Sequence, residues 1–378
     1  MTRGRKKIGI VTYFGVSNYG SALQAYALQN VISELGYDAF VIDHVNTSLP
    51  HNVTMKQRVF RSRIVSGMKT PLKMIELLRA KEKRPSCSDK KKASFLEFEK
   101  VSLHVSGEDY LQTNSFDAFV CGSDQVWNLD MPGMSDLFFL RFAPQGKRIA
   151  YAPSFGMASV PWYNRRKLKK YLDEIPWVSV REASGVAIVE KVTGREVPQV
   201  LDPVLLARPD FWGDVDSLRD DILVCYFLSE CSAHFREIRR LAYERGLRII
   251  WIEAGSPPIM GGEVRTPSPV EFVNLLKSAS YICTDSFHGL AFSLIFKTPY
   301  SIFDRAYESN AQQATRIDSL LSLVGADTTR SGACRSSDDL SFEEASELLS
   351  VERSKSLSYL ATSLIEATGG DCDGGRIS

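Results

Sequence analysis

One alternation of patterns occurs twice along this chain of 378 residues: an apolar strand, a turn, an amphipathic helix, then another strand. The first copy starts with the apolar run at 7–14, continues through a helical pattern that stops at Gly36, and returns to a strand at 38–43. The second copy starts with the run at 222–228, and its first helical pattern stops at Gly246. Strands joined through a helix pair in parallel, because the crossover needs that length of chain. The sequence therefore predicts an α/β fold with two parallel-sheet domains.

The domain boundary follows from the connector "ARPDFWGD", after which the alternation restarts. A chain of this length also exceeds the size at which a single core stops growing. We expect an N-terminal domain over 1–210, a C-terminal domain over 211–330, and a C-terminal helix with a frayed tail over 331–378. A basic helical insertion is expected at about 55–100. Its charges indicate solvated helices, or alternatively a basic face toward anionic lipid or phosphate.

Composition narrows the class of protein. The net charge of +1 gives no general attraction to nucleic acid, and the seven cysteines show no metal-binding spacing, so neither a metal nor a cofactor is expected. The apolar run near the N-terminus is too short for a signal peptide, and no run reaches the roughly 20 residues that cross a bilayer. We expect a cytoplasmic protein, with peripheral contact to the inner face of an anionic membrane as a further possibility.

Two polar clusters follow predicted strands of the first domain, where open parallel sheets bind ligands. After the first strand, Asn18, Gly20 and Gln24 offer a close backbone approach and hydrogen bonds to a sugar or carboxylate, although a plain tight turn fits equally well. After the strand at 116–121 come Gly122, Ser123, Asp124 and Gln125, which with Trp127 resemble the lining of a carbohydrate site. The alternative for this second cluster is an Asx-turn beside a tryptophan in the core.

Two further clusters carry charged or titratable groups. Arg181 follows an apolar strand, where it pairs with an acid such as Glu182 or grips a phosphate or carboxylate. The stretch "CTDSFHGLAFSLIF" places Asp285 and Ser286 at a strand end, with His288 and Gly289 at the first turn of an apolar helix. A histidine on an apolar face is usually a core residue, but a strand-to-helix turn lies at the edge of a crevice, and a helix N-terminus favours a bound anion. We therefore expect His288 to be functional.

The segments "VTYFGVSNYGSALQAYAL", "FDAFVCGSDQVWN", "YAPSFG", "SVREASG", "QVLDPVLL" and "CTDSFHGLAFSLIFKTPY" occur in this order. Together they resemble the polysaccharide pyruvyl transferase family, over roughly residues 7–323. The resemblance implies a GT-B-like fold, in which two Rossmann-like domains face a cleft. It also implies transfer of a pyruvyl group from phosphoenolpyruvate onto a sugar of a cell-surface polysaccharide, as a ketal. The partners would be phosphoenolpyruvate as co-substrate and a sugar or lipid-linked oligosaccharide as acceptor.

The resemblance also assigns roles. His288 matches the histidine of the family's His-Gly motif and is the candidate acid or base, with Asp285 or Ser286 orienting it or the substrate. Arg181, with Arg305 and Arg316 behind it, would hold the donor's phosphate and carboxylate. The sequence departs from the family at Ser286, where members with pyruvyl chemistry have an arginine, so either another cation substitutes or the donor or reaction differs. The alternatives are a GT-B-type glycosyltransferase using a nucleotide sugar and a non-catalytic glycan-assembly protein.

Overall fold

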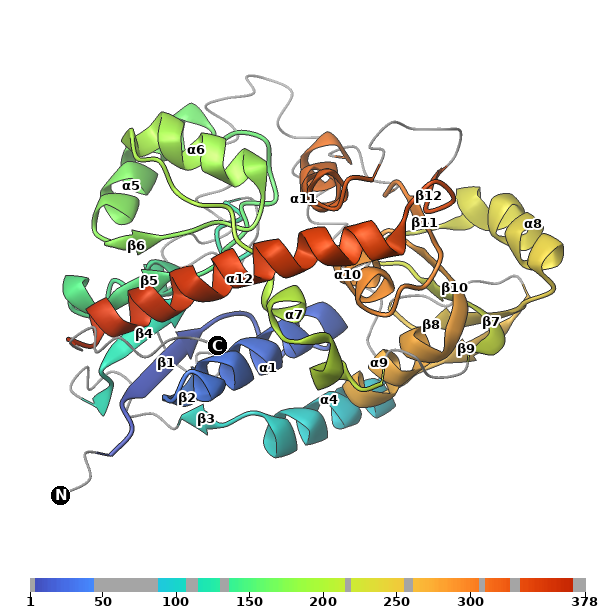
Figure 1. Ribbon diagram of the computed structural model, residues 1–378, viewed down its shortest axis with the longest axis horizontal. Helices are drawn as coiled ribbons and strands as arrows, with labels where there is room; N and C mark the ends of the chain where they lie inside the picture. The colour runs from blue at the N-terminus through green and yellow to red at the C-terminus, as the bar shows by residue number, and fades with distance from the viewer. Residues whose placement is uncertain are drawn as a thin grey trace, which may run out of the picture.

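The computed structural model describes residues 4–43, 88–106, 115–129, 136–214, 219–254, 261–305, 310–326 and 334–369, and all structural statements below concern these residues. They form two six-stranded sheets (Figure 1). The first sheet is parallel throughout and has the order β3-β2-β1-β4-β5-β6. Its strands are β1 (Lys7–Val11), β2 (Asp38–Ile42), β3 (Val105–Ser106), β4 (Ala118–Cys121), β5 (Arg148–Ala150) and β6 (Trp177–Val178).

The second sheet has the order β12-β11-β10-β7-β8-β9, and its edge strand β12 is antiparallel to β11. Its strands are β7 (Asp220–Tyr226), β8 (Arg248–Ile252), β9 (Glu263–Arg265), β10 (Ala279–Thr284), β11 (Tyr300–Phe303) and β12 (Cys334–Ser336). Counted within each sheet, both follow the order 3-2-1-4-5-6 of Rossmann domains. The predicted α/β fold with two Rossmann-like parallel-sheet domains, the GT-B-like arrangement, is confirmed.

Helices connect the strands as the sequence pattern indicates. In chain order they are α1 (Tyr19–Glu34), α4 (Asp89–Ser102), α5 (Trp162–Asp173), α6 (Ala183–Thr193), α7 (Pro203–Leu206), α8 (Phe235–Arg245), α9 (Pro269–Ser278), α10 (Phe287–Ile295), α11 (Asn310–Leu323) and α12 (Phe342–Ala367). Local signals fix several ends. Helix α9 begins at the capping box formed by Ser268 and Glu271, and α8 ends at Gly246 in the left-handed conformation.

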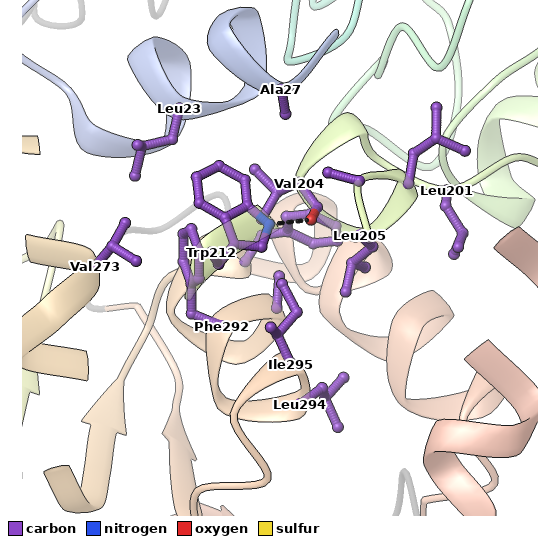
Figure 2. Packing of buried hydrophobic residues seen from close by; sticks show 14 of the residues in the cluster. Leu23, Ala27, Leu201, Val204, Leu205, Trp212, Val273, Phe292, Leu294 and Ile295 are labelled. Carbon is purple, nitrogen blue, oxygen red and sulfur yellow. Dashed lines mark hydrogen bonds between the residues drawn. The ribbon is translucent and has the colours of Figure 1, made fainter. Parts of the chain in front are cut away.

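A continuous apolar core joins the two domains. Trp212, in the connector after α7, packs among Leu23 of α1, Val273 of α9 and Phe292 of α10 and donates its indole N–H to the carbonyl of Val204 at 3.0 Å (Figure 2). Beside it, the rings of Tyr19 and Phe272 stack with their centroids 4.2 Å apart. Domains joined through an apolar interface hold a fixed relation, whereas polar interfaces permit motion. The side of the molecule formed by α1, α9 and α10 is therefore the rigid one.

The C-terminal helix α12 reinforces this connection. Helix α12 runs along both domains (Figure 1) and contacts α7, α10 and β5. Ser356 on this helix accepts a hydrogen bond from the backbone N–H of Leu201, and Arg353 donates to the carbonyl of Leu205. The tail helix therefore braces the segment that leads into α7.

The basic insertion is described only from Ser88 onward, and 55–87 lie outside the described residues. Its last helix, α4, differs from the expected solvated helix. Phe95 and Phe98 are buried on one face of α4, because they lie at the helical spacing of three residues, and Lys91 is buried one turn earlier. The Lys91 ammonium donates to the carbonyl of Glu253 in the C-terminal domain at 2.7 Å. Helix α4 is thus packed between the domains.

Candidate active site

The site lies where the carboxyl ends of the two sheets approach each other. In each sheet the strand order reverses between two neighbouring strands, β1 and β4 in the first and β7 and β10 in the second. Loops that follow such strands diverge and leave room for a ligand. The first turn of α1, which follows β1, touches the first turn of α10, which follows β10: a Cβ built on Gly20 would lie 2.0 Å from Nδ1 of His288. Only glycine at position 20 permits this contact.

His288 and Asp202 form the central pair of the site. His288 Nε2 lies 3.7 Å from Asp202 Oδ1, and both residues are buried. This separation exceeds a hydrogen bond by a few tenths of an ångström, and His288 Nε2 has no hydrogen-bond partner within the described residues. Catalytic hydrogen bonds are often long without substrate and shorten when it binds. A histidine whose Nε2 faces a buried carboxylate has the arrangement of an acid–base group.

Asp202 is held ionised by its surroundings. It caps α7 through the backbone N–H of Val204 and accepts hydrogen bonds from Arg181 Nη1 at 2.6 Å and from Ser123 Oγ at 2.9 Å. Burial acts to raise the pKa of the Asp202 carboxyl, but His288, the Arg181 guanidinium and the Val204 N–H together hold that pKa below its usual range. A negative charge is therefore kept next to the His288 ring.

Arginine side chains gather beside this pair. Arg181 is 4% exposed, and its guanidinium carbon lies 4.4 Å from the centroid of the Phe287 ring. Its Nε and Nη2 make no hydrogen bond within the described residues, although Asp124 and Glu182 approach to 4.0 Å. When the Gln125 amide is oriented with its oxygen toward Arg316, that oxygen accepts hydrogen bonds from Arg316 Nη1 at 2.6 Å and Nη2 at 2.7 Å. The Arg316 Nε has no hydrogen bond within the described residues.

The charge of Arg316 is unfavourable in this structure. Arg316 is 5% exposed, and burial followed by the charges of Arg181 and Arg305 lowers its pKa, which Glu182 and Asp124 only partly oppose. Buried guanidinium groups that repel one another and retain unsatisfied N–H donors are stabilised by an anion. Arg181 and Arg316, whose charges Arg305 reinforces, are therefore suited to a phosphate or a carboxylate.

Asp285 follows β10 directly, and its carboxylate is held by backbone groups. Its carboxylate accepts hydrogen bonds from the backbone N–H groups of Leu228 and Ser229 and from the Ser229 hydroxyl, and so ties β10 to the loop after β7. Arg305 lies next to it, with Nε 3.1 Å from the Asp285 carbonyl and 3.6 Å from its carboxylate. The carboxylate that faces His288 is Asp202, because Asp285 is occupied by these backbone donors. Ser286 is buried and begins α10 as its N-cap residue.

Several predicted binding residues make contacts within the scaffold. Asn18 caps α1, and Gln24 donates to Thr12 and to backbone carbonyls while accepting from the Ser123 N–H, which uses both ends of its amide. Gly122 has a φ of 114°, and Gly289 packs against Thr284 of β10. These four residues shape the loops. Asp124 stays at the site, where it accepts a hydrogen bond from Ser21 at 2.6 Å and faces Arg181.

The site is closed in this structure, whereas the resemblance implied a cleft. His288 is 6% exposed, and Arg181 and Arg316 are as deeply buried. The arginines and the His288–Asp202 pair nevertheless leave polar atoms without hydrogen bonds within the described residues. A substrate reaches these atoms only after the neighbouring side chains or elements move.

Asp202 is the important residue that sequence reasoning omitted. It ends the strand-like run "PQVLD", in the same position that singled out Asp124 and Asp285 after their strands. The rule of polar residues at strand ends would have found it. Its neighbour in space, Glu182, also has a structural role, since one oxygen accepts from the backbone N–H groups of Phe155 and Gly156.

The chain thus has two Rossmann-like domains, with a buried histidine–carboxylate pair and buried arginines between them. The family model for polysaccharide pyruvyl transferase matches residues 18–305, and the chain belongs to this family. It is accordingly a transferase of polysaccharide biosynthesis. No curated protein matches the chain.

Solved structures similar to the chain are remote in sequence. A putative UDP-N-acetylglucosamine 2-epimerase from Listeria monocytogenes has 9% identity and a TM-score of 0.44, over 96% of this chain and 94% of that one. UDP-GlcNAc 2-epimerase from Neisseria meningitidis has 11% identity and a TM-score of 0.42, over 94% of both chains. The glycosyltransferase SnogD from Streptomyces nogalater has 13% identity and a TM-score of 0.38, over 95% of both chains.

Proposed function

We propose that this transferase takes its pyruvyl group from phosphoenolpyruvate and forms a ketal with two hydroxyls of a sugar acceptor. The observation that carries the proposal is the buried arginine cluster beside the His288–Asp202 pair. Phosphoenolpyruvate bears a phosphate and a carboxylate on the same carbon. Arg181 and Arg316 have N–H donors without hydrogen-bond partners within the described residues, which suits two such anionic groups.

The arginine cluster also accounts for Ser286, where the family has an arginine. Arg181 lies against the ring of Phe287, and Arg305 donates to the carbonyl of Asp285. Two guanidinium groups therefore contact the residues on either side of Ser286. Arg316 interacts electrostatically with both of them. In our proposal these three side chains supply the positive charge that the family places at position 286.

The chemistry assigns a proton transfer to His288. Protonated His288 gives its proton to the methylene carbon of phosphoenolpyruvate, which becomes a methyl group, and a cation-like centre forms at the carbon that carries the phosphate. One sugar hydroxyl attacks this carbon and loses its proton to His288. Phosphate then leaves, and the second hydroxyl attacks the same carbon, its proton leaving with the phosphate. Asp202 stabilises the protonated form of His288 through the cycle.

Phosphate release from phosphoenolpyruvate tests this proposal. Purified protein is incubated with phosphoenolpyruvate, with and without a cell-envelope glycan extract, and the product is analysed by NMR. Acceptor-dependent phosphate release and a new ketal methyl signal are expected, and in D2O that methyl group should carry one deuterium. Nucleotide release from nucleotide sugars, with no phosphate from phosphoenolpyruvate, would instead support the glycosyltransferase alternative.

The proposal also covers the class of acceptor and the compartment. Membership of the family supports a sugar of a polysaccharide, and a lipid-linked oligosaccharide is the form in which we expect it. No helix among the described residues is long and apolar enough to cross a membrane. We propose that the protein works in the cytoplasm without any further cofactor.

A further inference from the structure

Helix α5 (Trp162–Asp173) presents a basic face on the outside of the N-terminal domain. Its sequence, "WYNRRKLKKYLD", contains five basic residues and one acidic residue. On the inner face, Leu168, Tyr171 and Leu172 are buried in the second apolar core of this domain. Figure 1 shows α5 beside α6 on the flank of the domain, away from the C-terminal sheet. The polar face of α5 is therefore available to a partner.

The charges on this face are only partly neutralised. Lys169 pairs with Asp173 at 2.9 Å and Lys167 approaches Asp136 at 3.6 Å. Arg166 and Lys170 are exposed and make no ion pair with any residue that the structure describes. They are four residues apart on the helix and so lie on one stripe.

An aromatic residue extends the same stripe. Trp162 precedes Arg166 by four residues, and it is 67% exposed. Of the other tryptophans, Trp127, Trp212 and Trp251 are buried, and Trp177 is half-buried. The stripe therefore combines an exposed indole ring with two exposed cations, Arg166 and Lys170.

An anionic membrane surface fits this combination better than a protein partner does. Tryptophan inserts at the level of lipid headgroups, while arginine and lysine extend to anionic headgroups and phosphates. Protein interfaces are also enriched in tryptophan and arginine but are depleted of lysine, so Lys170 is the residue that favours the membrane. We propose that the face of α5 formed by Trp162, Arg166 and Lys170 docks the protein on an anionic membrane.

The position of α5 gives this docking a consequence. A helix that follows a strand in a parallel sheet starts near the carboxyl end of that strand. Trp162, at the start of α5, therefore lies toward the carboxyl ends of the strands, where the site is. The loop from β5 to α5 passes the site on its way, since the Phe155 and Gly156 N–H groups in this loop bind Glu182, next to Arg181. Docking through α5 therefore brings the site edge close to the bilayer, where a lipid-linked acceptor would be held.

Vesicle sedimentation of the full chain tests the proposal without any assumption about donor or acceptor. The vesicles contain phosphatidylcholine alone or with phosphatidylglycerol, at low and high salt. Binding to the anionic vesicles at low salt is expected, with weakening at high salt. The double variant Arg166→Gln/Lys170→Gln should bind about 25-fold more weakly, at about fivefold for each charge near the surface. Trp162→Ser should also weaken binding.

A matched control lies on the other domain. Tyr243 on α8 is 89% exposed, and Arg236, two helical turns before it, is also exposed, so Arg236→Gln/Tyr243→Ser removes one exposed aromatic ring and one exposed charge. This variant should bind as the wild type does. In addition, the tryptophan emission of the wild type should shift to shorter wavelength on the anionic vesicles, and Trp162→Phe should lose that shift.

Three results would overturn the proposal. The first is a wild type that does not bind the anionic vesicles at low salt. The second is binding that persists in the α5 variants, which would assign it to another surface such as the basic insertion at 55–100. The third is equal weakening by the α5 and α8 variants, which would show a nonspecific effect of charge. The α5 variants should still release phosphate from phosphoenolpyruvate with a soluble acceptor. Loss of membrane binding can then be distinguished from loss of the proposed reaction.

Discussion

Replacing Asp202 by asparagine should destabilise the protein strongly. The Asp202 carboxylate is buried and lies between the Arg181 guanidinium, at 2.6 Å, and the His288 imidazole, at 3.7 Å. An asparagine oxygen can keep the bond from the Val204 N–H, but its NH2 group would then face a second donor, Arg181 Nη1. Breaking one partner out of a buried ion pair costs about 3–5 kcal/mol, because the other charge stays buried without compensation.

The assay is urea unfolding followed by tryptophan fluorescence. The control is Asp210→Asn, which breaks the surface pair of Arg208 and Asp210, whose side chains are 73% and 67% exposed. That pair contributes about 0–1 kcal/mol at most. Adding Arg181→Met to Asp202→Asn should recover part of the lost stability, since the double variant removes both charges of the 2.6 Å pair. A cost below about 1 kcal/mol for Asp202→Asn, equal to that of the control, would refute the reasoning.

The same variant has an expected pH dependence. The folded pKa of Asp202 lies below its unfolded value, which is about 3.9. Its stabilisation is therefore fully present above that unfolded value and is lost as the pH falls toward the folded value. The stability difference between the wild type and Asp202→Asn should be constant from about pH 6 to 5 and should shrink as the pH is lowered further, toward about 3. A difference that does not depend on pH would show that Asp202 acts through shape and not through charge.

Three further predictions concern turnover and donor binding. His288→Gln should lower acceptor-dependent phosphate release by about 10²–10⁴-fold with unchanged circular dichroism, and near-normal release would make His288 a structural residue. Gly20→Ala should also impair turnover, because the added Cβ would lie 2.0 Å from the imidazole and displace it; unaltered kinetics would mean that His288 need not stay there. Arg316→Gln should raise KM for phosphoenolpyruvate about tenfold or more, with Arg316→Lys less affected, since a charged hydrogen bond contributes about 1.5–3 kcal/mol; an unchanged KM for both would remove Arg316 from the anion site.

Much of the fold was readable from local pattern. The period of apolar residues and the glycines that end helices predict the alternation of strands and helices, and that alternation requires parallel sheets. The rule that ligands bind at strand ends singled out Arg181 and His288, because it depends only on where each strand stops. The family motifs added the identity of the chemistry.

The partners of these residues were decided by the tertiary structure alone. Asp285 and Asp202 both follow strand-like runs, and nothing local tells that one bonds to the loop after β7 while the other faces His288. That choice depends on how the two sheets meet through the apolar core around Trp212. The burial of Arg316 and Lys91 also depends on how the domains meet. Both lie in polar stretches of sequence that are typical of solvated helices, and packing between the domains removes their side chains from water. Sequence patterns report which residues share a face of one element, whereas the contact between two faces depends on the folding of the whole chain.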